Sequence, residues 1–175
     1  MSSFDEEYEQ RLAEARARAG TRGRDDVLDY LSVRATNDRL RAAGVTWLLD
    51  SFTALAGELN RAGAGLTIAR QEAHRFRVGH STMVGTQLVI RNGIRALTVE
   101  AGWPRAPGDG IVRGGGLACA RLTHFGDAEA GEELLLAPWG QDATRWLSAR
   151  DRGPHEEFLE DRVRRHVGRL LGDRR

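Results

Sequence analysis

The sequence predicts an α+β protein with N-terminal helices, a central antiparallel β-sheet and a C-terminal helix. Apolar residues recur at helical spacing to about residue 62, and from about Leu66 the period changes to two. A second amphipathic helical pattern returns near the C-terminus. We therefore expect three segments, 1–62, 63–150 and 151–175, folded as one structural domain.

Three helices are expected in the first segment. The first covers 3–19, where a serine followed three residues later by a glutamate forms a capping box. A short second helix begins near Asp25, and a longer one runs from about 36 to Gly63 or Gly65. The apolar stripe of the long helix consists of Leu40, Gly44, Trp47, Leu48, Phe52, Leu55 and Leu59.

The clearest sheet element is a hairpin around Asn92-Gly93, the dipeptide preferred in type I′ turns. With these two residues as the loop, Arg91 lies opposite Ile94. The alternation then places on one, apolar face Thr86, Leu88, Ile90, Leu97, Val99 and Ala101. The other, largely polar face carries Gln87, Val89, Arg91, Ala96, Thr98 and Glu100.

Short connections predict that the remaining strands are also antiparallel. These strands are expected at Leu66–Ala69, Ala73–Val78, Leu117–His124 and Glu133–Ala137. The final helix is expected to begin at Gly153-Pro154, because proline favours the first helical position. Its stripe consists of Leu159, Val163, Val167 and Leu170.

Charge and composition exclude several function classes. The chain has 26 basic residues against 25 acidic ones, a net charge of +1, so we expect no nucleic-acid partner. All the basic residues are arginine, which is typical of a GC-rich bacterial genome and excludes catalytic lysines and a P-loop. The acidic N-terminus and the lack of a long apolar stretch predict a cytoplasmic protein without a membrane partner.

No motif for catalysis or metal binding is complete. Ser81, in Gly-His-Ser-Thr-Met, resembles a hydrolase nucleophile elbow for three residues only, and a polar turn between strands is expected instead. The spacing of His74 and His80 fits no zinc motif, even with His124 and Glu100 as further ligands. The single Cys119, in an apolar run, is expected to be buried and structural. We expect no catalytic residue, no metal and no cofactor.

The stretch 102–116 is the most unusual part of the sequence, because it is long and rich in glycine and proline. Its Trp103 is expected either to plug the core or to line a concave site with Arg105 and Arg113. Glu100 and His124 complete the candidate ligand site, which would take a carboxylated or phosphorylated metabolite.

These patterns favour a non-catalytic bacterial protein that acts through protein–protein interaction or self-assembly. The alternative is a small anionic-metabolite binding protein or enzyme that uses the sheet face and the 102–116 loop. A homodimer is expected, because the helical stripes present more apolar surface than one small sheet can cover.

The hairpin register predicts which substitutions damage the core. Leu97→Ala should lower the free energy of unfolding by roughly 2–5 kcal/mol, because Leu97 lies on the apolar face. Thr98→Ala should cost less, and chemical denaturation of the two variants measures the difference. A larger loss for Thr98→Ala would show that the register is shifted by one residue.

Overall fold

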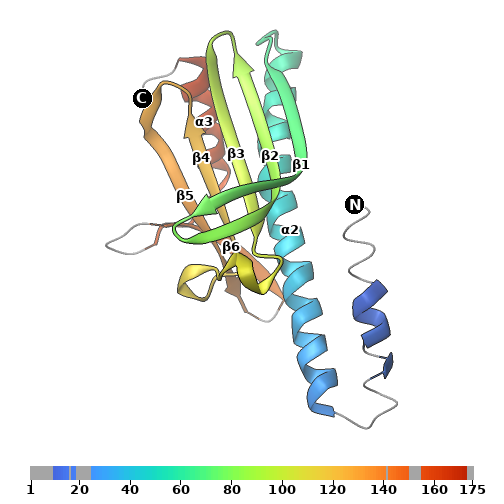
Figure 1. Ribbon diagram of the computed structural model, residues 1–175. Helices are drawn as coiled ribbons and strands as arrows, with labels where there is room; N and C mark the ends of the chain where they lie inside the picture. Colours follow the sequence, from blue (N-terminus) through green and yellow to red (C-terminus); the bar gives the residue numbers. More distant parts are fainter. Residues whose placement is uncertain (1–9, 16, 19–24, 141, 150–154, 173–175) are drawn as a thin grey trace. The chain divides into compact units, whose positions relative to one another are not determined.

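The computed structural model describes residues 10–15, 17–18, 25–140, 142–149 and 155–172 (Figure 1). The chain divides into two units, Met1–Leu40 and Arg41–Arg175, and the second contains the whole sheet. In chain order the elements are α2 (Asp25–Arg61), β1 (Thr67–Val78), β2 (Ser81–Asn92), β3 (Arg95–Trp103), the 3₁₀ turns η1 (Pro107–Asp109) and η2 (Arg113–Gly115), β4 (Ala118–His124), β5 (Asp127–Trp139), β6 (Ala143–Ser148) and α3 (Glu160–Leu171). This order confirms the predicted α+β class.

Helix α2 is one continuous helix, and the prediction of a short helix followed by a separate long one is wrong. No glycine or proline lies between 25 and 43 to end the first of them, so the capping signal near residue 36 is overridden. Of the helix predicted over 3–19, residues 10–15 and 17–18 are helical, and the rest lies outside the described residues.

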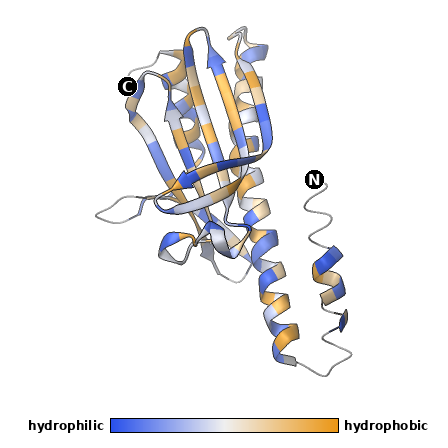
Figure 2. Cartoon of the chain, in the orientation of Figure 1, coloured by the Kyte–Doolittle hydropathy of each residue, from blue (hydrophilic) through white to orange (hydrophobic). Residues whose placement is uncertain are grey.

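The six strands form an antiparallel meander in which each strand pairs with its neighbours in sequence. Apolar and polar bands alternate along the strands in Figure 2, because successive side chains point to opposite faces. One face, here called the helical face, carries Thr86, Leu88, Ile90, Leu97, Val99, Ala101, Ala120, Leu122, His124, Glu132, Leu134, Leu136, Trp146 and Ser148. The predicted division of β2 and β3 between two faces is therefore confirmed.

The second half of α2 and helix α3 cover the helical face, and the core lies between these helices and the sheet (Figure 1). Leu48, Leu49 and Phe52 of α2 are fully buried. Gly44 lets α2 approach β5 closely, since a Cβ atom there would lie 2.6 Å from a methyl group of Leu136. The stripe of the long helix, on which the homodimer expectation partly rested, is thus buried at Gly44, Leu48 and Phe52, while Trp47 stays exposed.

The β2–β3 turn lies one residue later than predicted, so each residue of β2 pairs with a residue two positions further along β3. Asn92 pairs with Arg95, so the loop residues are Gly93 and Ile94 rather than Asn92 and Gly93. Positive φ is confined to Gly93, at +59°, as in turns with glycine at the first central position. A shift of two preserves the side of every side chain, which explains why the faces were predicted correctly although the partners were not.

The β1–β2 hairpin bends sharply and curls over the face opposite the helices (Figure 1). The bend occurs at a bulge between Gln71 and His74, where Ala73 has a φ of +53°. Gly85 pairs with His74 on one side and with Gly102 on the other. A Cβ atom on Gly85 would overlap the backbone of β3, so this close approach requires glycine.

The curled hairpin buries a small apolar cluster on that face, formed by Phe76, Met83 and Cys119. Burial, with the charge of Glu133, raises the pKa of the Cys119 thiol to about 11. The thiol therefore stays protonated at neutral pH. This confirms the prediction that Cys119 is a buried structural residue.

The C-terminal segment departs from its prediction in two ways. Residues 155–159 are extended and α3 begins only at Glu160, because Glu157 pairs with Leu147 and Phe158 is buried against the helices. Leu159 is consequently half exposed rather than part of the buried stripe. The strand β6 was not predicted at all. Among the described helices, none is long and apolar enough to cross a membrane.

Gly85→Ala should lower the free energy of unfolding by roughly 1–3 kcal/mol, because the added methyl group would force β3 away at the bend. Gly108→Ala is the matched control, since no atom lies within 4 Å of a Cβ built there, and its effect should stay within about 0.5 kcal/mol. Denaturant titration measures both. Equal stability of the two variants would contradict the role given to Gly85.

Candidate functional site

The structure does not bring the five predicted ligand-site residues to one place. Glu100 of β3 pairs with Arg121 on the face opposite the helices, whereas His124 of β4 lies on the helical face. The thickness of the sheet therefore separates their side chains.

Of the three residues from the 102–116 stretch, Trp103 ends strand β3, and Arg105 and Arg113 belong to the folded loop that follows. Trp103 is buried, and the guanidinium carbon of Arg105 lies 3.7 Å from its ring centroid. The loop is fixed to the β1–β2 hairpin, because Ser81 Oγ donates to the carbonyl of Ile111 and accepts from its N–H. The Arg113 guanidinium packs on Gly79 of the same hairpin. Trp103 is thus a plug in the core, the first of the two arrangements expected for it.

A polar cluster lies beneath the curled hairpin, on the face opposite the helices. The Oε1 atom of Glu100 is 2.7 Å from His74 Nε2. Its Oε2 atom accepts from Nε and Nη2 of Arg121, at 2.8 and 2.6 Å. Arg121 also donates to the carbonyl of Arg77. These contacts join β1, β3 and β4, and they compensate the charge of the buried carboxylate.

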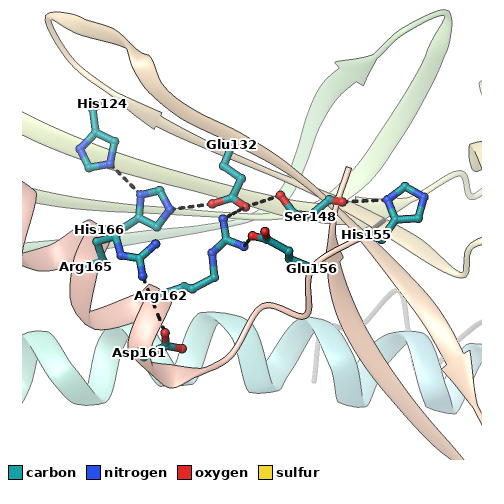
Figure 3. A network of polar contacts seen from close by, with 9 residues as sticks. All are labelled: His124, Glu132, Ser148, His155, Glu156, Asp161, Arg162, Arg165 and His166. Atoms are coloured by element: carbon teal, nitrogen blue, oxygen red, sulfur yellow. Dashed lines mark hydrogen bonds and ion pairs between the residues drawn. The ribbon is translucent and has the colours of Figure 1, made fainter. Parts of the chain in front are cut away.

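A second cluster, on the helical face, is centred on Glu132 of β5 and attaches α3 to the sheet (Figure 3). One carboxylate oxygen accepts from Ser148 Oγ and from Arg162 Nη2, both at 2.6 Å. The other lies 3.0 Å from His166 Nε2. The remaining nitrogen of His166 lies 2.9 Å from His124 Nε2, with the two rings stacked. The cluster is a chain of polar contacts from β4 through α3 to β5 and β6.

Two members of this cluster, His124 and Glu132, have shifted pKa values. Burial, together with His166 and Arg169, lowers the pKa of His124 to about 4, while Asp127 acts in the opposite direction. Burial acts to raise the pKa of Glu132, but hydrogen bonds from His166 and Ser148 outweigh it and the pKa is lowered. His124 is therefore neutral and Glu132 charged at neutral pH.

The sign of the resulting pH dependence follows from His124. Its folded pKa of about 4 lies below the ordinary value of 6.5, so an unfolded or opened chain takes up the proton more readily than the folded one. The contribution of His124 to the free energy of unfolding is complete above about pH 6.5. It is lost as the pH falls toward 4, by up to about 3 kcal/mol. Glu132, whose pKa is lowered, adds a further loss below its ordinary pKa.

An aromatic cleft opens beside β6, between this strand, α2 and the segment 157–159. Its volume is about 280 Å³. It is lined by Ala43, Gly44, Trp47, Thr144, Arg145, Trp146, Glu157, Phe158 and Leu159. The indole N–H of Trp146 donates to the carbonyl of Gly44, which ties β6 to α2 at the base of the cleft.

The cleft lies at an incomplete sheet edge. Strand β6 is the last strand of the sheet, and residues 156–158 cover only its second half, through Ser148 N–H to Glu156 and Phe158 N–H to Trp146. Every second residue of a strand directs its backbone groups to the same side, so Thr144 directs its N–H and carbonyl outward as well. Among the described residues, no strand pairs with that side of Thr144.

Exposed apolar side chains gather around the same edge. Three of the nine large apolar residues that are exposed among those described are Trp47, Trp139 and Leu159. Trp47 and Leu159 line the cleft, and Trp139 lies at the β5–β6 turn with the Arg145 guanidinium 3.8 Å from its ring centroid. The edge and cleft together, here called the β6 edge, form a candidate binding surface.

Sequence reasoning missed the β6 edge because it missed β6. A strand could have been predicted over 143–148, because residues of two kinds alternate there after a turn with Gly140. Trp47 was assigned to the buried stripe, one residue from Leu48, which is fully buried. Comparisons with family models, curated proteins and solved structures find no match to the chain.

Glu132→Gln should lower the free energy of unfolding by about 3 kcal/mol, because it leaves the largely buried Arg162 guanidinium with only the exposed carboxylate of Glu156 as an anionic partner. Glu129→Gln, at an exposed site on the same strand, should stay within about 0.5 kcal/mol of wild type. Urea denaturation at pH 7.5 measures both. Similar stabilities for the two variants would show that the Glu132 cluster does not hold α3 in place.

Proposed function

We propose that this protein acts through protein–protein interaction, without catalysis, and that it assembles with a second copy of itself through the β6 edge. The observation that carries the proposal is the juxtaposition of outward backbone groups at Thr144 with an aromatic cleft of about 280 Å³. An unpaired strand edge accepts an added strand, and a pocket beside it accepts one of that strand's side chains.

The chain already uses this mode of binding on itself. Residues 156–158 add to the second half of β6 in antiparallel orientation, and Phe158 enters the core beside them. The chain leaves the edge at Leu159 to enter α3, so the line of pairing stops at the cleft. A second extended segment would continue it along Thr144.

A second copy fits this edge for reasons of symmetry and charge. Two identical strands pair in antiparallel orientation around a two-fold axis, and closed two-fold dimers are the commonest oligomers. The cleft lining carries both Arg145 and Glu157, so a two-fold contact can place opposite charges against each other. Association would also remove Trp47, Trp139 and Leu159 from water, and exposed apolar clusters of this kind mark interaction surfaces.

The anionic-metabolite alternative has less support from the geometry. Its residues divide between the two faces of the sheet and the loop packed on the hairpin. Asp109 of that loop pairs with Arg75 of β1 at 2.7 Å, so a carboxylate of the chain itself already occupies this neighbouring guanidinium. No observation on the described residues assembles these groups around one concave site.

Light scattering on the wild-type chain at about 100 µM should return a mass near 39 kDa, twice the 19.3 kDa of one chain. Trp47→Arg and Leu159→Arg should return the single-chain mass, because each places a charge in the interface. Thr144→Pro should do the same, since it removes an outward N–H without removing a bond to β5.

Phe125→Arg is the matched control, because Phe125 is an exposed apolar residue at the β4–β5 turn, away from the cleft. This variant should remain dimeric. A wild-type mass of about 19 kDa at 100 µM would overturn self-assembly. Variants at Trp47, Leu159 and Thr144 that all remain dimeric would show that the chain assembles through another surface.

A further inference from the structure

The C-terminal segment 155–172 both limits the β6 edge and forms one wall of its cleft. Glu156 and Phe158 pair with Ser148 and Trp146, and Leu159 lines the cleft. The buried charges that attach this segment to the sheet meet at Glu132, which bonds Arg162 and His166 of α3. Loss of the contacts at Glu132 would therefore expose the part of β6 that residues 156–158 now cover.

The weak point of the attachment is the pair of imidazoles. His124 Nε2 and His166 Nδ1 lie 2.9 Å apart, a distance that requires one nitrogen to donate and the other to accept. When both rings carry two protons, both nitrogens bear hydrogen and the contact becomes repulsive. The folded arrangement therefore holds at most one imidazolium in this pair.

The carboxylates around the pair already have arginine partners. Helix α3 contributes Arg162 and Arg169, β5 contributes Glu132 and Asp127, and Glu156 forms a second ion pair with Arg162. From α2 the neighbour is the uncharged ring of Phe52, and β6 contributes the hydroxyl of Ser148. His155 contacts the Ser148 carbonyl through Nδ1, a contact that an imidazolium can also make. Each of these carboxylates already contacts an arginine, although the charge of Asp127 partly favours a proton on His124.

We propose that the His124–His166 pair is an acid-released clamp: a second proton on the pair frees segment 155–172 from the sheet and uncovers β6 from Trp146 to Ser148. That the uncovered edge then changes self-assembly rests on the proposed function; the release itself does not. Both rings of the pair are buried where α3 meets the helical face.

The size of the effect follows from the difference in the pKa of His124 between the folded and the opened chain. The pKa of His124 is lowered to about 4 by burial and by its cationic neighbours, and in the opened segment it returns to about 6.5. The population of the opened form should then rise roughly 30-fold between pH 7.5 and pH 5.0. The rise is independent of protein concentration when it comes from the clamp alone.

Hydrogen exchange of the full chain at pH 7.5 and pH 5.0 tests the clamp, with rates corrected for the intrinsic effect of pH. Amides of 156–158 and α3 should lose protection together, roughly 30-fold, and should exchange faster than those of the central strand β3 at both pH values. Unchanged protection of α3 at pH 5.0 overturns the clamp. So does exchange of α3 at the same rate as β3, because the segment would then leave only when the whole sheet unfolds.

His124→Gln should retain a donor toward His166 while removing the titration, so its α3 protection should change much less between the two pH values. His74→Gln, in the cluster on the other face, should retain the wild-type pH response. If His124→Gln does not fold, the NMR titration of wild-type His124 decides: titration near pH 6.5 with α3 still protected overturns the proposal. Light scattering at both pH values reports on assembly separately. Release with an unchanged dimer mass contradicts only the link between the clamp and assembly, and a single-chain mass at both pH values contradicts only the proposed function.

Discussion

The constraint on which the rest of the structure depends is that the meander has one apolar face and needs two helices to cover it. Leu88, Leu97 and Leu122 are fully buried there, and each requires a cover that the sheet cannot provide. The second half of α2 supplies most of it and α3 the remainder. The polar cluster at Glu132 and the cleft at β6 both lie where these two helices meet the sheet, so their positions follow from the covering of this face.

Local pattern predicted the fold well where one period dominated. The alternation across β2 and β3 identified both faces. The predicted turn lay one residue too early, which shifts the strand pairing by two and leaves each side chain on its side. Prediction failed where a tertiary contact overrode a local signal. A helix start at Gly153-Pro154 satisfies local rules, yet burial of Phe158 and pairing with Leu147 keep the following residues extended until Glu160.

The polar cluster at Glu132 was beyond sequence reasoning for a different reason, which is the separation of its members along the chain. His124 and His166 are 42 residues apart, and Glu132 and His166 are 34 apart. The sequence marked His124 as unusual, but it grouped this residue with Glu100, and the two side chains lie on opposite faces. Grouping them correctly requires the full strand register, including the bulge between Leu122 and His124, which no local pattern specified.

The order of the strands has a consequence for how the chain reaches its folded state. Each strand pairs with the one made just before it, so the sheet is built from local contacts of the kind that form quickly. The contact between Trp146 and Gly44 spans 102 residues, and α3 comes later still. During synthesis on the ribosome, the apolar side of α2 therefore stays partly uncovered until β6 and α3 have been made. The nascent chain must be protected from aggregation throughout that interval.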